Sequence, residues 1–271
     1  MWNTGCMTQP ESQPVLTEVR GSTGILTLNR PKALNSLNYD MVKIIDAALR
    51  EWADDDAVEQ VVICSNSRHF CSGGDVKTAR AEILAGNEAL IDEFFAFEYT
   101  MNGFIAKYPK PYVTLASGVI MGGGMGVSAH GSHLVVTEDA FASMPEMNIG
   151  YITDVGMSWT LQHLPGHSST QLGKFLGLTG YRMTPDDMLA LGLASHKVAT
   201  VDGVLDQLVD QGLSSLDDAS LQPDHSQLAT RFDQIDATFI GPWTEIEGRL
   251  DGEFGDMVRT LTAQASPSSL V

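Results

Sequence analysis

The pattern of apolar and polar positions predicts alternating strands and helices over the first 160 residues. Two short extended runs, 15–19 and 24–28, flank a Gly-Ser-Thr turn and predict a β-hairpin. Apolar residues then recur every three or four positions from Met41 to Trp52, with Asn38 as the capping residue of an amphipathic helix. An apolar run at 61–64 predicts a buried strand.

The same alternation continues along the chain. We expect a helix over about 87–108, strands over 112–116 and 134–137, and a glycine run that opens a helix after a strand ending near 119–120. Strand, helix and strand in this rhythm are typical of parallel βαβ units, and therefore of an α/β fold.

After Gly156 the strand signals fade and the pattern favours helices. Thr184-Pro185 is expected to supply the cap and first turn of a helix near Asp186, segment 213–226 is expected to be a linker, and a final helical region is expected around 243–263. The expected organisation is an N-terminal tail over 1–14, a core over 15–200 and a helical C-terminal region over 201–271.

Composition places the chain among ordinary globular proteins, with 43% hydrophobic and 18% charged residues over 271 positions. Sixteen basic residues against 34 acidic ones give a formal net charge of −18. This charge repels a phosphate backbone and an anionic lipid surface, so we expect neither nucleic acid nor membrane as a partner. An anionic small molecule would need a local basic or dipolar site.

The cysteines and the N-terminus bear on the compartment. Three cysteines, Cys6, Cys64 and Cys71, have no metal-type spacing and form no disulfide framework. No apolar run approaches the ~20 residues that span a bilayer, and residues 1–14 lack the charged and apolar regions of a secretion signal. These features predict an unexported protein of the reducing cytoplasm.

Two glycine segments each follow a predicted strand: Phe-Cys-Ser-Gly-Gly-Asp at 70–75 and Met-Gly-Gly-Gly-Met-Gly at 121–126. Amide groups at such positions can stay free to bind a ligand. The first segment alone favours an ordinary turn in which Asp75 caps a helix. The second lacks the spacing of dinucleotide and nucleotide loops. If amides of the two segments converge, they form a two-donor oxyanion hole.

A third segment, 143–156, holds two carboxylates, Glu146 and Asp154, among mostly apolar residues. Apolar surroundings raise the pKa of a carboxyl group, which suits general acid–base chemistry. Periodicity alone favours a loop in which Asp154 caps a helix.

Other candidate nucleophiles and ligands have little support. Ser128 and His130 resemble a nucleophile elbow with one residue too many, and Cys71 has no partner base. The histidines are unclustered, so no metal site is expected; they include His69, His133, His163 and His167.

Several segments in this order resemble the crotonase (enoyl-CoA hydratase/isomerase) superfamily, namely Leu-Asn-Arg-Pro-Lys-Ala-Leu-Asn-Ser-Leu at 28–37, Ser-Gly-Gly-Asp at 72–75, Lys-Pro-Tyr-Val at 110–113, Met-Gly-Gly-Gly at 121–124 and Met-Pro-Glu at 144–146. The resemblance covers about residues 15–200. It implies a crotonase-type spiral of ββα units, an acyl-CoA ligand and a homo-trimer or hexamer.

Within the superfamily the chain most resembles the 3-hydroxyisobutyryl-CoA hydrolases of valine breakdown. The shared features are Met-Gly-Gly-Gly-x-Gly followed by Ser-x-His-Gly, Met-Pro-Glu-x-x-Ile-Gly-x-x-x-Asp-Val-Gly, and the pair Glu98-Tyr99. The resemblance implies oxyanion amides from Gly74 and Gly123, chemistry by Glu146 and Asp154, and a substrate contact by Glu98. Coenzyme A is part of the substrate, so no separate cofactor is expected.

The remaining site residues also come from the resemblance. Backbone of Lys32, Ala33 and Leu34 is expected to contact the adenine, Ser72 and Asp75 are expected beside the substrate, and Arg30 or Lys32 is expected to offset the unfavourable net charge.

The resemblance leaves three functions to separate. The first is hydrolysis of a short-chain 3-hydroxyacyl-CoA. The second is an enoyl-CoA hydratase or isomerase, although those enzymes carry an acid where this chain has Gly126. The third is a non-catalytic binding module. Thr153 stands where the hydrolases have Phe-Pro, and the sequence ends at Val271, where they usually continue, so a shortened C-terminal region is expected.

Overall fold

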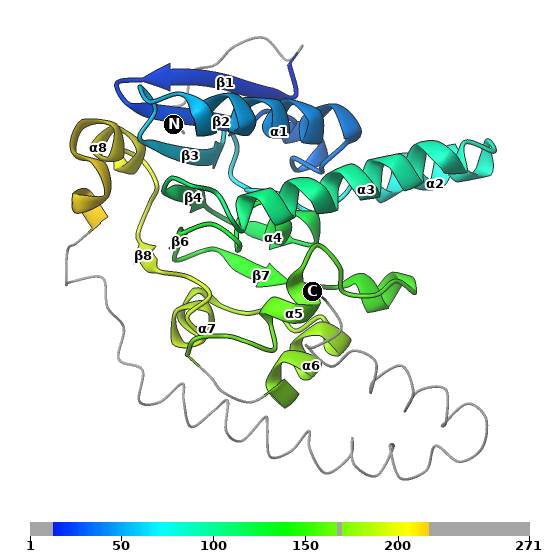
Figure 1. The fold of residues 1–271 in the computed structure, drawn as a ribbon. Coiled ribbons are helices and arrows are strands. Elements are labelled where there is room, and N and C mark those ends of the chain that lie inside the picture. Colours follow the sequence, from blue (N-terminus) through cyan, green and yellow to red (C-terminus); the bar gives the residue numbers. More distant parts are fainter. Residues whose placement is uncertain (1–12, 167–169, 217–271) are drawn as a thin grey trace.

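The computed structural model describes residues 13–166 and 170–216, and its main feature is a six-stranded sheet in the order β1-β2-β3-β4-β6-β8 (Figure 1). Only β1 is antiparallel to its neighbour. A second, two-stranded parallel sheet joins β5 to β7. The strands are β1 (Val15–Arg20), β2 (Thr23–Leu28), β3 (Gln60–Ser65), β4 (Tyr112–Ala116), β5 (Val119–Met121), β6 (His133–Thr137), β7 (Phe141–Ser143) and β8 (His196–Val198).

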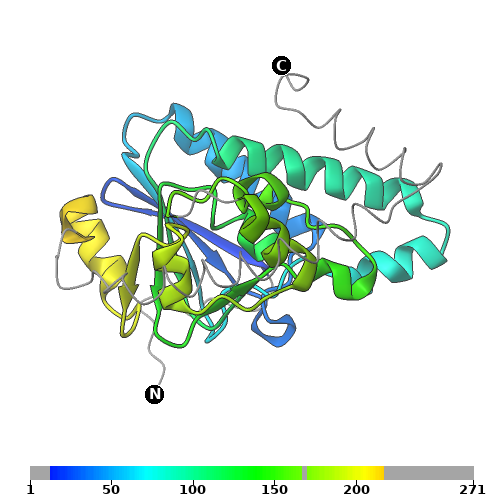
Figure 2. The same ribbon diagram turned by 90° about the horizontal axis from the view of Figure 1, so that it is seen from below.

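Helices cover both faces of the main sheet. They are α1 (Tyr39–Asp54), α2 (Val76–Leu84), α3 (Glu88–Ile105), α4 (Gly123–Gly126), α5 (Met157–Thr160), α6 (Thr170–Thr179), α7 (Pro185–Ala190) and α8 (Val204–Gln211), with short 3-10 turns η1 (Pro31–Ala33), η2 (Glu146–Ile149) and η3 (Gly212–Leu216). Seen from below, α8 lies across the strands from α1 and α3 (Figure 2).

The central strands are mostly apolar because both of their faces are buried. Side chains alternate between the faces. Leu26 and Ile63 pack in the larger core with α1 and α3. Their neighbours Ile25 and Val62 pack in the smaller core with α8. Every residue of β2 and β3 is accordingly buried.

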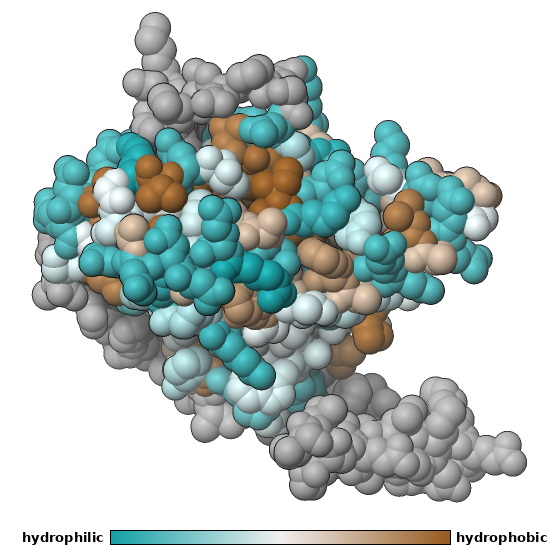
Figure 3. Space-filling model, turned by 45° about the horizontal axis from the view of Figure 1, so that its top comes forward, coloured by the Kyte–Doolittle hydropathy of each residue, from teal (hydrophilic) through white to brown (hydrophobic). Residues whose placement is uncertain are grey.

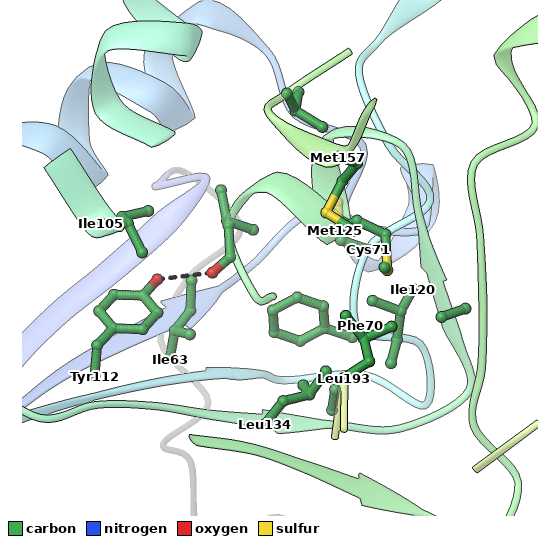
Figure 4. Close-up of a cluster of buried hydrophobic side chains, with 14 of the residues drawn as sticks. Ile63, Phe70, Cys71, Ile105, Tyr112, Ile120, Met125, Leu134, Met157 and Leu193 are labelled. Atoms are coloured by element: carbon green, nitrogen blue, oxygen red, sulfur yellow. Dashed lines mark hydrogen bonds between the residues drawn. The ribbon is translucent and has the colours of Figure 1, made fainter. Parts of the chain in front are cut away.

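The larger core extends from the sheet to the glycine segments. Figure 4 shows Phe70 and Cys71 packed among apolar side chains of β3, β5 and α4. Tyr112 is the one polar group drawn there that needs a partner, and its hydroxyl donates to the carbonyl oxygen of Val127 at 2.9 Å. The strand-end loops are therefore attached to a rigid interior rather than to the surface.

The structure confirms the predicted hairpin, the first helix and its cap, and the early parallel strands. Asn38 accepts a hydrogen bond from the Met41 amide at 3.0 Å. The predicted cap at Thr184 is also confirmed, because it forms a complete capping box with Asp187.

Three expectations on element type need correction or lie outside the structure. Strand structure does not end at Gly156: β8 pairs with β6, and its three half-buried residues carry too weak an apolar pattern to be recognised. Residues 213–216, the start of the predicted linker, belong to η3. The predicted helical region around 243–263 lies outside the described residues, and the division into tail, core and C-terminal region stays a prediction.

Within 13–166 and 170–216, none of the helices combines the length and apolar character that crossing a bilayer requires.

Gly24 sets how closely α1 approaches the sheet. A Cβ atom there would lie 2.6 Å from Cε3 of Trp52, a buried α1 side chain. We predict that Gly24→Ala lowers the free energy of unfolding by roughly 1–3 kcal/mol, because the helix must shift. Urea denaturation measures this loss. Gly103→Ala is the control: Gly103 is exposed inside α3 with nothing within 4 Å of an added Cβ, so it should instead gain up to about 1 kcal/mol. Equal losses in both variants would contradict the packing argument.

Candidate active site

Backbone hydrogen bonds join the first glycine segment to two other stretches of chain. Cys71 donates its amide to the Val119 oxygen at 3.0 Å and accepts from the Met121 amide at 3.0 Å. On the other side, Leu37 donates to the Gly73 oxygen and accepts from the Asp75 amide, each at 2.8 Å. The segment after β3 thus lies between the residues before α1 and the end of β5, although they are distant in sequence.

Glycine is required where these segments meet. Gly73 has a φ of +108° and Gly122 a φ of +48°, both in the region that L side chains avoid. A Cβ atom on Gly73 would lie 3.2 Å from the Met121 oxygen, and one on Gly124 would lie 2.7 Å from the Cys71 oxygen. The two glycine segments are therefore in backbone contact.

The amides of Gly74 and Gly123 remain free. Neither donates a hydrogen bond within the described part of the chain, and Gly123 is the first residue of α4, where an amide has no partner inside the helix. A Cβ atom on Gly123 would lie 3.4 Å from the Gly74 nitrogen, while one on Gly74 would meet nothing within 4 Å. The two predicted oxyanion donors lie side by side, with open space in front of Gly74.

That open space is a cavity of about 710 Å³, which is large enough for a small-molecule ligand. Its walls include both glycine segments, the acidic stretch after β7, and apolar residues of α2 and α3. Val76, Ile83 and Leu84 of α2 are exposed, and apolar side chains emerge at this end of the molecule (Figure 3). The cavity combines an apolar wall with a polar floor.

Three carboxyl groups face the cavity: Glu98 of α3, Glu146 at the start of η2, and Asp154 in the loop before α5. Glu98 and Glu146 are buried, at 2% and 8% exposure, and Asp154 is half-buried. Oε1 of Glu98 lies 2.7 Å from the position of a Cβ on Gly123, and Oε1 of Glu146 lies 3.0 Å from that of a Cβ on Gly122. The acids therefore border the free amides.

Burial shifts the protonation of these acids. The pKa of Glu146 is raised to about 7, mainly by burial; the residue's own amide opposes this shift and the charge of Asp154 adds to it. Burial raises the pKa of Glu98 to about 8, again with a contribution from Asp154. Oε1 of Glu98 and Oε2 of Glu146 are buried without a hydrogen-bond partner among the described residues. Such unpaired oxygens are costly, and are typical of a site that awaits a ligand.

The loop that carries Asp154 is fixed on several sides. Asp154 accepts a hydrogen bond from the Tyr99 hydroxyl at 2.7 Å. Val155 has a φ of +45°, and its carbonyl oxygen accepts from Nε2 of His130 at 2.6 Å. Thr153, the departure from the hydrolase pattern, donates to the Gly177 oxygen of α6 at 3.1 Å. This chain thus uses its own contacts to place the loop.

The other predicted contact residues are divided between the cavity and its surroundings. Ser72 lines the cavity, and its amide donates to the Leu34 oxygen at 3.0 Å. The Lys32–Leu34 turn therefore lies next to Ser72 but does not line the cavity. Asp75 caps α2, which confirms the capping interpretation, and it also pairs with Arg30 at 3.1 Å. Burial acts to raise the pKa of Asp75, but the hydrogen bonds from Thr78 and Arg30 outweigh it, so the pKa is lowered. The substrate-binding roles of these residues stay predictions.

The dismissed nucleophiles have structural roles. Ser128 is fully buried and donates to the Gly124 oxygen at 2.7 Å, while His130 supports Val155. Cys71 is fully buried, which raises the pKa of its thiol to about 12. Across the described residues no group of three or more His, Cys, Asp or Glu side chains is placed to hold a metal ion.

Sequence reasoning missed two features of the site. Tyr99 belongs to the Glu98-Tyr99 pair but had no assigned role; it does not line the cavity, but its hydroxyl donates to Asp154, which does. Its position one turn after Phe95, a lining residue of α3, is the signal that could have found it. Arg80 of α2 is the only basic residue among the described residues that line the cavity. No spacing pattern marks it.

The fold and this site together define a class of protein. A family model for enoyl-CoA hydratase/isomerase proteins matches residues 23–271. The chain belongs to this family. A solved enoyl-CoA hydratase from Rhodobacter sphaeroides is 37% identical with a TM-score of 0.76, over 95% of this chain and 76% of that one. A carnitinyl-CoA dehydratase from Mycobacterium thermoresistibile is 34% identical with a TM-score of 0.75, over 96% and 73%. The expected crotonase-type α/β fold is confirmed.

Comparison with curated proteins identifies a more specific group of relatives. A zebrafish (Danio rerio) protein named 3-hydroxyisobutyryl-CoA hydrolase, mitochondrial, is 36% identical over 97% of this chain and 69% of its own length. The mouse protein of the same name is 42% identical over 69% of this chain, and a probable 3-hydroxyisobutyryl-CoA hydrolase of Arabidopsis thaliana is 41% identical over 68%. The matched region spans about half the length of these last two relatives. The mitochondrial names do not support the expected cytoplasmic location.

The buried Glu98 carboxyl predicts an unusual dependence of stability on pH. Its pKa is about 8 in the folded chain against an ordinary 4.5, so its contribution to stability is complete below pH 4.5 and is lost as the pH rises through 8. Glu98→Gln cannot ionise, so it lacks this loss. We predict that the free energy of unfolding of Glu98→Gln, minus that of the unmodified chain, is larger at pH 9 than at pH 5 by roughly 2–4 kcal/mol. Urea denaturation at both values measures this difference. Asp92→Asn, an exposed change on the same helix, is the control, and a Glu98→Gln difference that ignores pH would contradict the burial argument.

Proposed function

We propose that the protein hydrolyses the thioester of a short-chain 3-hydroxyacyl-CoA, with 3-hydroxyisobutyryl-CoA, an intermediate of valine breakdown, as the first candidate. The observation that carries the proposal is the pair of free amides, Gly74 and Gly123, next to a buried and unpaired Glu146 carboxyl. The family membership and the names of the curated relatives support the same reaction.

The two amides act on the thioester oxygen. When the carbonyl carbon is attacked, that oxygen takes up negative charge, and fixed amide donors stabilise it without having to reorganise. Each such donor is typically worth ~10²–10³ in rate. Gly123 is the first residue of α4, so its amide also lies at the positive end of a short helix.

Glu146 supplies the attack. In one route its carboxylate adds to the carbonyl carbon and the carbon–sulfur bond breaks to release the CoA thiolate. Water then opens the acyl-glutamyl anhydride, which restores the Glu146 carboxylate, and the proton that water releases converts the thiolate to the thiol. In the other route the carboxylate removes a proton from water, which attacks directly, and the thiolate takes up that proton as it leaves. Both routes consume one water and give a 3-hydroxy acid and free CoA thiol. Both require Glu146 in its ionised form.

Asp154 and Glu98 are left for the acyl part of the substrate. Asp154 would accept a hydrogen bond from the substrate hydroxyl or from the attacking water. Glu98, whose pKa of about 8 keeps it mostly protonated at neutral pH, can donate a hydrogen bond to the substrate. One carboxyl of the cavity can thus accept a hydrogen bond from the hydroxyacyl group while another donates one.

Gly126 argues against the hydratase and isomerase alternatives. Those enzymes carry an acid at this place, but a Cβ here would lie 2.8 Å from Cβ of Val155 and 2.9 Å from Nδ2 of Asn102. No side chain fits without moving the loop that holds Asp154. The family's hydratases use two acids for water addition, and at the place of the first of them this chain has Gly126.

The CoA end needs a cation because the chain carries a net charge of −18. Arg30 is already paired with Asp75. Arg80, on the α2 wall of the cavity, is placed to contact a phosphate group of CoA, while the exposed apolar residues of the same helix contact its pantetheine arm.

Glu146→Gln tests the reaction. We predict a loss of thiol release of at least 10³-fold from 3-hydroxyisobutyryl-CoA, since the amide neither attacks nor removes a proton. In the unmodified protein the rate should rise about tenfold per pH unit up to about 7 and then level, because the raised pKa of Glu146 keeps it protonated below that value. A thiol-reactive dye measures both.

Other outcomes of these assays would select the alternatives. Loss of enoyl absorbance without thiol release across a panel of short acyl-CoAs would identify a hydratase or isomerase. CoA binding without turnover of the whole panel would identify a binding module. Full thiol release by Glu146→Gln would remove Glu146 from the chemistry.

Arg80→Ala tests the phosphate contact. We predict a KM for the acyl-CoA raised roughly tenfold with little change in kcat, because the lost ion pair lies far from the reacting carbon. The same acyl group on N-acetylcysteamine, which lacks phosphates, should react equally with both proteins. Arg182→Ala removes the same charge outside the cavity lining and is the control. A loss that is equal for both thioesters would show that Arg80 supports the wall rather than the phosphates.

A further inference from the structure

We propose that Tyr99 is a positioning residue, which fixes the Asp154 carboxylate in the cavity and keeps it charged for the reaction. The proposal rests on the proposed function only where activity is measured. Its structural part, the control of Asp154 by a tyrosine of another element, is testable on the protein without substrate.

The hydrogen bonds around Tyr99 have a defined direction. Its hydroxyl donates to Oδ2 of Asp154 at 2.7 Å, the short distance expected of a bond to a charged acceptor. A hydroxyl has a single proton, so the contact of 3.1 Å between the Tyr99 and Tyr151 hydroxyls must be donated by Tyr151. Tyr151 thus strengthens Tyr99 as a donor, and the chain of bonds ends on Asp154.

Ring packing holds this chain in place. Phe95 stacks on Tyr151 with centroids 5.9 Å apart and also contacts the Tyr99 ring at 5.8 Å. Phe95 and Tyr99 are one turn apart on α3, a long helix packed on the core, whereas Tyr151 belongs to the Asp154 loop. The aromatic group therefore attaches the loop to the helix that also carries Glu98.

The backbone beside Asp154 needs this support. Val155 is β-branched and has a φ of +45°, a conformation that costs of order 1–3 kcal/mol and persists only where neighbours enforce it. His130 holds the Val155 carbonyl oxygen from one side. Tyr99 holds the Asp154 carboxylate from the other.

Burial opposes the ionisation of Asp154. The titratable groups that face it are Glu98 from α3 and Glu146 from η2, and Arg80 of α2 is the basic residue in the lining of the same cavity. Burial raises the pKa of Asp154 above its ordinary value, and the Tyr99 hydrogen bond is the first contribution that acts in the opposite direction. Without it, Asp154 would take up a proton more readily and lose its fixed orientation.

Tyr99→Phe in the full chain tests this, since it removes the hydroxyl and keeps the ring. The titration of Asp154 is followed by carboxyl NMR on aspartate-labelled protein, with the signal assigned by its absence from Asp154→Asn. We expect a higher pKa of Asp154 in Tyr99→Phe than in the unmodified protein. With 3-hydroxyisobutyryl-CoA, kcat/KM should fall roughly tenfold, the size of one lost charge-assisted hydrogen bond.

Two comparisons separate positioning from general support. In the Asp154→Asn background, Tyr99→Phe should cause no further loss, because its effect acts through the carboxylate. Tyr39→Phe is the matched control: it removes a tyrosine hydroxyl that donates to the Glu93 carboxylate at 2.6 Å, away from the cavity lining, and should leave both kcat/KM and the Asp154 titration unchanged.

An unmoved Asp154 titration, or equal activity losses from Tyr99→Phe with and without the Asp154 carboxylate, would overturn the proposal. Thermal unfolding of each variant identifies any that fail to fold. If the unmodified protein releases no thiol from any acyl-CoA, the proposed function fails, and the titration alone still decides the role of Tyr99.

Discussion

The site depends on one close backbone approach, between the segment after β3 and the segment after β5. Cys71 forms two main-chain hydrogen bonds across it, and the absence of a Cβ at Gly73 and Gly124 is what permits that distance. The approach uses the backbone groups of Cys71 and leaves the amides of Gly74 and Gly123 unused. The proposed chemistry requires two donors at one point, and a side chain at Gly73 or Gly124 would push the two segments apart.

Burial of acids is the second constraint, and it works against stability. Glu98 and Glu146 each have an oxygen without a partner in the described region, and Val155 lies in a disfavoured conformation. A chain selected for stability alone would remove all three features. Their concentration around one cavity indicates that the rigid core behind them, in which Phe70 and Cys71 are fully buried, supports a strained and poorly hydrated site.

Much of the fold could be predicted because the signals are local. The hairpin, the cap at Asn38 and the apolar strands follow from neighbouring residues, as does the cap at Asp75. β8 was missed because its pairing with β6, not its own sequence, makes it a strand. The glycine segments and the acids were found through motif spacing, yet their contact depends on parallel strands that bring distant loops together. The Tyr99 bond to Asp154 joins residues 55 positions apart, and no periodicity reports it.

The net charge of −18 and an anionic CoA ligand are compatible because the two effects act over different distances. Repulsion by surface acids is screened beyond roughly 8–10 Å in physiological salt, so it slows the encounter more than it weakens the complex. In the proposed reaction the amides of Gly74 and Gly123 act at hydrogen-bond distance, on a charge that develops only as the carbonyl is attacked. Dipoles are suited to this task, since a fixed cation beside Glu146 would pair with its carboxylate and lower the pKa that burial has raised. Among the described residues, Arg80 on the α2 wall is the one basic side chain that lines the cavity. For the proposed reaction this arrangement is favourable, because a site without a cation beside Glu146 keeps the pKa of that carboxyl at about 7.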